Sequence, residues 1–130
     1  MAKDALDLEK AQDWDGAKRM WEKIEKNKQY CCAGFAVYKQ AWAAFQNNDS
    51  TSALALAQKA AGMHGEQRIP ARFLVGDALY RQGEYQRAKD FFINLLSQVS
   101  DKDQKATARK KIALCNQKLG KPDGDGVVNP

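Results

Sequence analysis

Apolar residues recur at helical intervals through residues 71–98, and one polar break divides them. The apolar positions before the break are Phe73, Leu74, Val75, Leu79 and Tyr80, and those after it are Ala88, Phe91, Phe92, Leu95 and Leu96. Intervals of three and four residues place such positions on one face of an α-helix. The break contains Gly83, which supplies the positive φ needed just past a helix end. The pattern therefore predicts two amphipathic helices joined by a tight turn.

The same arrangement occurs twice more upstream. Small residues occupy equivalent places at Ala17, Ala53 and Ala88, which are separated by 36 and 35 residues. Twelve residues before each of them lies another small residue, namely Ala5, Ala41 and Gly76. Small residues let neighbouring helices approach closely, and hairpins of this kind must stack to bury both of their faces. The spacing predicts three helical hairpins.

The third segment has the most regular pattern. A small residue, a turn glycine, an aromatic residue, an alanine and a second aromatic residue fall on Gly76, Gly83, Tyr85, Ala88 and Phe92. These residues resemble the signature of the tetratricopeptide repeat (TPR), a unit of about 34 residues that forms two antiparallel helices. The first segment keeps Trp14, Ala17 and Trp21. The second keeps its alanines but has Asn48 at the glycine position and Ser50 at the aromatic position.

The resemblance implies an all-α fold, a right-handed α-solenoid of three TPR-like helical hairpins. Residues 104–119 predict a C-terminal capping helix, because an apolar stripe faces one side and lysines cover the remainder, before Gly120 and Pro122 end it. We expect one TPR-like domain over residues 1–121, with repeats at about 1–33, 34–68 and 69–103. Residues 122–130 have loop composition and are expected to form a flexible tail.

Composition and charge narrow the function classes. The 130 residues are 44% hydrophobic and 28% charged, and no apolar stretch approaches the roughly 18–20 residues that span a bilayer. No export signal is visible at the start of the chain, so we expect a cytoplasmic protein, or a soluble domain of a larger or anchored one. Residues 101–121 hold seven basic and two acidic side chains, so the net charge of +5 is concentrated on the predicted capping helix. A solvated helix face accounts for this charge, and nucleic acid is not the expected partner.

The three cysteines, Cys31, Cys32 and Cys115, form no Cys-x-x-Cys motif. Their number is odd, and neighbouring cysteines bridge only with strain, so we expect unpaired packing thiols in a reducing compartment. His64 is the sole histidine and lies in a connector without an evident nucleophile. The run from Asp123 to Gly126 resembles the start of a calcium loop, but the chain ends before the required glutamate. We therefore predict no catalytic residues, no metal and no cofactor, and a protein that is not an enzyme.

The resemblance also implies a binding surface on the leading helix of each repeat. The family's contact positions fall on Phe35, Tyr38, Trp42 and Phe45 in the second repeat, and on Phe73, Asp77, Tyr80 and Arg81 in the third. Four aromatic residues thereby share one helical stripe, and aromatic anchors with polar neighbours are typical of peptide-binding surfaces. The expected function is a non-enzymatic scaffold, adaptor or chaperone-like module that binds a protein or peptide partner in a concave groove.

Alternatives remain open at this point. The aromatic stripe also fits ordinary packing between adjacent repeats, and the capping helix or a second copy of the chain also fits the groove. One alternative function is a nucleic-acid-binding helical repeat that uses the basic capping helix. Another is a self-assembling repeat module, which would make the chain a homo-oligomer.

Overall fold

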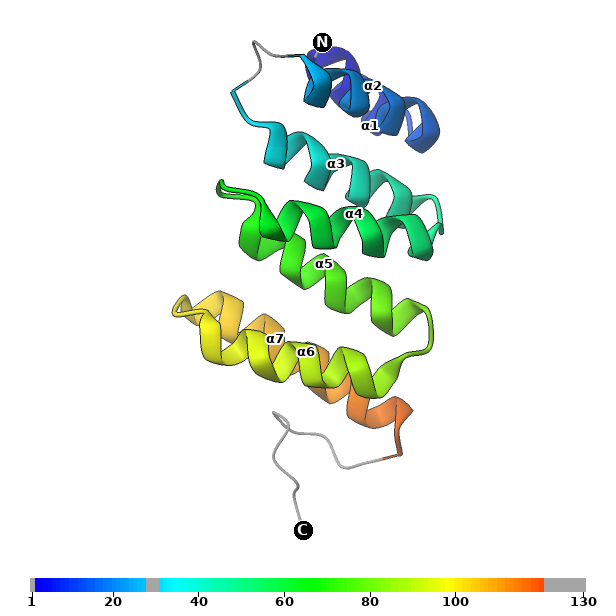
Figure 1. Cartoon of the computed structure of the whole chain (residues 1–130). Helices are drawn as coiled ribbons and strands as arrows, with labels where there is room; N and C mark the ends of the chain where they lie inside the picture. The colour runs from blue at the N-terminus through cyan, green and yellow to red at the C-terminus, as the bar shows by residue number, and fades with distance from the viewer. Residues whose placement is uncertain (1, 28–30, 121–130) are drawn as a thin grey trace. The chain divides into compact units, whose positions relative to one another are not determined.

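The computed structural model describes residues 2–27 and 31–120, and these residues form seven α-helices and no strand (Figure 1). The helices are α1 (Ala2–Lys10), α2 (Trp14–Lys26), α3 (Ala33–Gln46), α4 (Ser50–Gly62), α5 (Arg68–Arg81), α6 (Tyr85–Gln98) and α7 (Lys102–Lys118). This is the all-α order expected from the repeats. The capping helix predicted at about 104–119 is confirmed as α7. The predicted tail, residues 122–130, lies outside the described residues.

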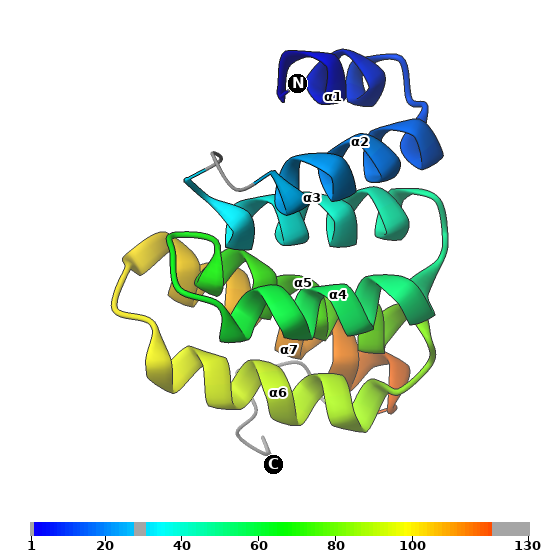
Figure 2. The ribbon, with the colours of Figure 1, turned by 45° about the horizontal axis from the view of Figure 1, so that its top comes forward.

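The helices pack in adjacent pairs within two compact units. The first unit ends at Ala78 and the second begins at Leu79, so the boundary falls near the end of α5. In the first unit α1, α2, α3 and α4 pack against one another in chain order, as Figure 2 also shows. In the second unit α6 packs against α7. The single domain predicted over residues 1–121, with its three repeat boundaries, stays a prediction.

Small residues line the helix crossings, as the spacing predicts. Ala5, Ala17, Ala41, Ala53 and Ala88 are fully buried, and Gly76 is buried as well. Trp21 and Phe92, the large residues expected beside them, are each 1% exposed. Three buried clusters of the first unit combine residues from successive helices: Ala5, Trp21, Ile24 and Ala36; then Val37, Ala60 and Ala71; then Ala44, Ala53 and Ala78.

Aspartates begin three of the helices. The carboxylates of Asp13, Asp49 and Asp101 accept hydrogen bonds from the backbone N–H groups three residues further on, at 3.0, 3.1 and 2.9 Å. Each bond satisfies one of the N–H groups that lack a partner in the first helical turn. These caps fix where α2, α4 and α7 start.

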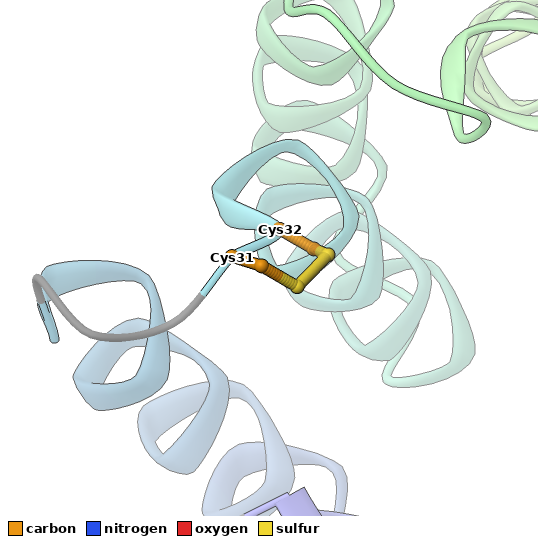
Figure 3. The surroundings of a disulfide bond; sticks show 2 residues. All are labelled: Cys31 and Cys32. Atoms are coloured by element: carbon orange, nitrogen blue, oxygen red, sulfur yellow. A yellow bond between two sulfur atoms is a disulfide. The ribbon is translucent and has the colours of Figure 1, made fainter.

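Cys31 and Cys32 form a disulfide at the start of α3 (Figure 3). The expectation that these neighbours stay unpaired is wrong. Cys32 is the N-cap residue of α3, with φ −130° and ψ 59°, so the chain bends there before the helix begins. This non-helical backbone lets both side chains turn to the same side. Cys115 is buried on α7, as a packing thiol would be.

Candidate partner-binding surface

Four aromatic residues follow one stripe of α3, and we call them the α3 aromatic surface: Phe35, Tyr38, Trp42 and Phe45. Their spacing of three, four and three residues puts them on one side of the helix. Phe35 is 40% exposed, whereas the other three are half-buried. The stripe is therefore partly covered by neighbouring residues, and its most accessible ring lies at the N-terminal end of α3.

Phe35 and Trp42 contact the second helix of the first hairpin. The ring centroids of Phe35 and Trp21 lie 5.7 Å apart, and those of Trp42 and Trp14 lie 5.0 Å apart. Both pairs are T-shaped, with interplanar angles of 86° and 84°. The quadrupoles of aromatic rings favour this edge-to-face geometry. These two residues thus perform part of the inter-repeat packing that was the alternative interpretation of the stripe.

Tyr38 and Phe45 pack on the other side of the stripe. Tyr38 lies against the cluster of Val37, Ala60 and Ala71, and Phe45 lies against the cluster that contains Ala78. Both clusters include residues of α4 and α5. The four rings therefore alternate along α3, with Phe35 and Trp42 toward α2, and Tyr38 and Phe45 toward the helices that follow.

Lys39 lies among the rings of this surface. Its ammonium nitrogen is 4.7 Å from the ring centroid of Trp42, 5.9 Å from that of Trp21 and 6.0 Å from that of Phe35. A cation within about 6 Å of a ring face is attracted by the ring quadrupole. The charge of Lys39 therefore helps to hold the rings of α2 and α3 together.

Glu9 of α1 completes this arrangement. One carboxylate oxygen lies 2.9 Å from the Lys39 Nζ, and the other accepts a hydrogen bond from the Trp21 Nε1–H at 2.8 Å. The side chains of Lys39 and Glu9 are only 15% and 10% exposed, so solvent screens the pair less than it screens a surface ion pair. The sequence did not predict these contacts of Glu9 with Lys39 and Trp21. A lysine inside an aromatic stripe is the signal that could have found them.

Tyr38 has acidic neighbours. Burial raises the pKa of the Tyr38 hydroxyl above its ordinary value, and the negative charges of Asp77 and Glu9 raise that pKa further. The hydroxyl consequently keeps its proton at physiological pH and remains a hydrogen-bond donor. Asp77 of α5 is thus close enough to the α3 aromatic surface to affect its chemistry.

The predicted residues on α5 divide between the two units. Phe73 and Asp77 are half-buried and belong to the first unit, together with the α3 aromatic surface. Tyr80 and Arg81 belong to the second unit, where the Tyr80 ring contacts that of Tyr85 with centroids 5.1 Å apart. The role of Tyr80 and Arg81 in partner binding stays a prediction.

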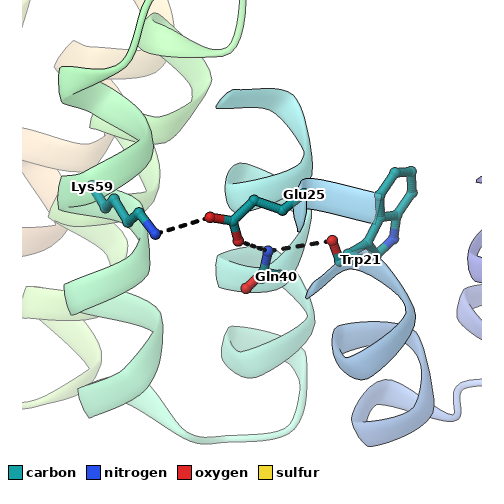
Figure 4. Close-up of polar contacts among 4 residues, drawn as sticks. All are labelled: Trp21, Glu25, Gln40 and Lys59. Carbon is teal, nitrogen blue, oxygen red and sulfur yellow. Dashed lines mark hydrogen bonds and ion pairs between the residues drawn. The ribbon is translucent and has the colours of Figure 1, made fainter. Parts of the chain in front are cut away.

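A polar network ties α3 to α2 and α4 beside the aromatic stripe (Figure 4). The buried Gln40 amide donates to the Glu25 carboxylate at 2.7 Å and to the Trp21 carbonyl oxygen at 3.4 Å. The other Glu25 oxygen lies 3.0 Å from the Lys59 Nζ. Lys39 and Gln40 are adjacent, yet they bind different acids on different helices. Through Glu25, Gln40 joins three successive helices.

Glu25 is electrostatically tuned by these partners. Burial acts to raise the pKa of its carboxyl, but hydrogen bonds from Gln40 and Lys59, with the charges of Lys59 and Lys26, bring the pKa below its ordinary value. The carboxylate form is therefore favoured at neutral pH. These side chains border a depression of about 390 Å³, whose lining contains several charged residues and no aromatic one.

The described part of the chain lacks the features of two other kinds of site. It contains no group of three or more His, Cys, Asp or Glu side chains placed to hold a metal ion. It also contains no helix that is both long and apolar enough to cross a membrane. His64 is exposed in the loop between α4 and α5.

Comparison with known proteins identifies the repeat. Residues 71–101 match the family model of the Tetratricopeptide repeat. The match and the seven helices of the described residues, packed in adjacent pairs, fit a TPR-like repeat protein. Repeats of this family generally mediate protein–protein interaction and are typically non-enzymatic. No curated protein and no solved structure matches the chain.

Proposed function

We propose that this protein is a non-enzymatic interaction module, acting as a scaffold, adaptor or chaperone-like protein. It binds a peptide or helix of a partner protein on the α3 aromatic surface. The observation that carries the proposal is Phe35, an aromatic ring that is 40% exposed at the end of a stripe. The neighbouring rings of that stripe are already held by packing, so the exposed ring is the one left available to a partner.

Preorganisation supports this assignment. The Phe35 ring rests against Trp21 and also lies 6.4 Å from the Tyr38 ring, centroid to centroid. A ring that is fixed before binding loses little conformational freedom when a partner arrives. Phe73 and Asp77, in the same unit, extend the surface with an apolar and an acidic group. Two or three apolar anchors on such a surface give micromolar affinity, at about 25 cal/mol per Å² of buried apolar area less the ordering costs.

The test starts from a ligand selected on the intact protein. A displayed library of random peptides is panned against the full chain, and the affinity of one selected peptide is measured by isothermal titration calorimetry. Phe35→Ala should weaken binding about tenfold, as expected for loss of an aromatic anchor. The matched control is Leu54→Ala, which removes a half-buried apolar side chain from α4. That control should bind the peptide as the parent does.

Trp42→Ala is a second probe, with an expected complication. It removes the edge contact with Trp14 and the ring nearest to Lys39, so the variant loses stability as well as binding. Trp42→Phe keeps a ring in that place and separates the two effects. Binding that is unchanged in both Phe35→Ala and Trp42→Ala would refute the α3 aromatic surface.

The two alternative functions predict different outcomes. A nucleic-acid-binding repeat requires the basic side chains of α7, so a double substitution of Lys110, which is exposed, and Lys111, which is half-buried, would remove most oligonucleotide binding. On our proposal the same double variant binds the selected peptide normally. A self-assembling module requires a sedimentation coefficient that rises with protein concentration, whereas an adaptor of this kind sediments as one species.

A further inference from the structure

A depression of about 380 Å³ lies between the start of α3 and the loop that joins α4 to α5, within the first unit. Its lining includes the Cys31–Cys32 disulfide, the exposed Phe35 ring and three loop residues, His64, Glu66 and Gln67. Both cysteines are exposed. A disulfide is thus open to solvent at the wall of a hollow that also offers an apolar ring.

Gln67 fixes the opposite wall of this depression. Its side chain is buried, and its amide donates to the carbonyl oxygens of Ala60 at 3.1 Å and Met63 at 3.0 Å. Gly34 and Gly65 both pack so closely on this amide that a Cβ at either position would collide with it. The loop is therefore anchored to the ends of α3 and α4. The wall opposite the disulfide is therefore held in position by hydrogen bonds.

Cys32 occupies a position that favours a sulfur anion. It is the N-cap residue of α3, and among the described residues its side chain makes no capping hydrogen bond. The first N–H groups of a helix and the helix dipole stabilise negative charge at this end. If the disulfide opens, the Cys32 sulfur is consequently the better leaving group, and Cys31 is the sulfur that an incoming thiolate attacks.

We propose that Cys31–Cys32 is a reversible thiol–disulfide exchange site, and that the depression beside it seats the apolar substituent of the reacting thiol. A thiolate attacks the Cys31 sulfur, the Cys31–Cys32 bond breaks, a mixed disulfide forms, and Cys32 leaves as a thiolate. A second thiolate attacks the substituent's sulfur in that mixed disulfide and releases Cys31. Two thiols are oxidised to one disulfide, and their two electrons and two protons end on the two cysteines. This site does not depend on the proposed partner-binding function.

The ligand class follows from the lining. Phe35 offers an aromatic face to a thiol with an apolar or aromatic substituent, and a small hydroxylated thiol gains nothing from it. Burying part of one ring favours the aromatic thiol by about fivefold at roughly 25 cal/mol per Å². We expect this preference only in the folded protein, because a short peptide keeps the two adjacent cysteines but does not form the depression.

The experiment compares the air-oxidised full-length protein with an oxidised peptide of residues 28–37. Each is reduced by benzyl mercaptan and by 2-mercaptoethanol, and Cys31 and Cys32 are followed by alkylation and peptide mass mapping. For each sample we take the ratio of the rate with benzyl mercaptan to the rate with 2-mercaptoethanol. We expect this ratio to be about five times larger in the protein than in the peptide. Acid quenching should trap the mixed disulfide on Cys31, and trapping on Cys32 would contradict the assigned direction of attack.

Variants separate the depression from the disulfide itself. Phe35→Ala should bring the ratio of rates down to the peptide's value, whereas Leu6→Ala, which removes an apolar residue of similar exposure (44%), should leave it unchanged. Circular dichroism should show the same helix content before and after reduction. The proposal is overturned if Cys31 and Cys32 stay reduced in air, if reduction unfolds the protein, or if protein and peptide show the same ratio.

Discussion

The turns of the second and third hairpins have the same hydrogen-bond pattern but reach it with different residues. In the second turn the N–H groups of Asn48 and Asp49 donate to the carbonyls of Phe45 and Ala44, at 3.1 and 2.9 Å. In the third, Gly83 and Glu84 donate to Tyr80 and Leu79, both at 3.0 Å. Both are helix C-terminal motifs with one residue at positive φ, 62° at Asn48 and 83° at Gly83.

The difference lies in how each turn accommodates that backbone. Gly83 adopts positive φ at little steric cost, whereas Asn48 is one of the few side chains that tolerate it. The second turn has a compensating cap, since the Asp49 carboxylate accepts from the Ser52 N–H, while Glu84 accepts no capping hydrogen bond from any described residue. One backbone motif is thus supported by conformational freedom in one hairpin and by a side-chain cap in the other. The family model matches residues 71–101, which contain the turn with the glycine.

The largest expected effect is that of Gly83→Ala. A Cβ at this position meets no described atom within 4 Å, so the cost comes from the positive φ alone, at about 1–2 kcal/mol of unfolding free energy. The matched control is Gly62→Ala at the end of α4, where space is equally open and φ is not positive. Urea unfolding followed by circular dichroism measures both. Equal effects of the two substitutions would contradict the assigned role of Gly83.

Removing the cap should have the next largest effect, and only in the second hairpin. Asp49→Ala loses the hydrogen bond from the Ser52 N–H and should lower the unfolding free energy by about 1 kcal/mol. Glu84→Ala removes the residue at the equivalent N-cap position, and it should change that free energy by no more than about 0.3 kcal/mol, since no side-chain cap is lost. Thermal unfolding of the two variants in one buffer tests the contrast. A similar cost for both would show that the caps do not distinguish the turns.

The Asp49 cap should also depend on pH. The side-chain and backbone hydrogen bonds of Ser52 lower the pKa of the Asp49 carboxyl below its ordinary value. A lowered pKa in the folded state stabilises the protein above the unfolded-state pKa of about 4, and the contribution is lost as pH falls through the folded pKa. The difference in unfolding free energy between the parent and Asp49→Ala should therefore shrink from pH 6 toward pH 2.5. A difference that stays constant over this range would contradict the prediction.

The smallest expected effects come from placing glycine in the other two turns. Gln12 has a φ of 60° at the equivalent position of the first hairpin. Gln12→Gly should stabilise the protein by about 0.5 kcal/mol, because glutamine tolerates positive φ less well than asparagine does. Asn48→Gly should be close to neutral, since the relief is offset by the greater freedom of glycine in the unfolded chain. Chemical denaturation ranks the two variants, and a larger gain at Asn48 would reverse the interpretation.

The helices, turns and capping helix could be predicted from the sequence because each depends on local periodicity. The small residues at 5, 17, 41, 53 and 88 recur at equivalent places 35 or 36 residues apart, and all are fully buried. The start of α7 at Lys102 was within two residues of the expectation. The local pattern and the tertiary packing require the same small residues at these positions, so the pattern is sufficient to predict the helices.

The candidate site was less predictable for a physical reason. Periodicity places Phe35, Tyr38, Trp42 and Phe45 on one stripe, but it does not give the direction in which each ring leans between two neighbouring helices. The Glu9–Lys39 pair depends on tertiary contacts, and the hydrogen bond from the Gln67 amide to the Ala60 carbonyl depends on the path of one loop, neither of which the periodicity gives. The Cys31–Cys32 disulfide depends on the bend before α3, which the apolar pattern does not encode.

The three tryptophans of the chain, Trp14, Trp21 and Trp42, all lie in the first unit. Intrinsic indole emission therefore reports on that unit, while the second unit contributes tyrosine emission alone. The Trp14 and Trp42 rings, 5.0 Å apart and nearly perpendicular, are close enough for exciton coupling between their excited states. The protein thus carries a built-in optical label on one side of the boundary between Ala78 and Leu79. A difference between the emission and helicity midpoints would show that the two units unfold separately.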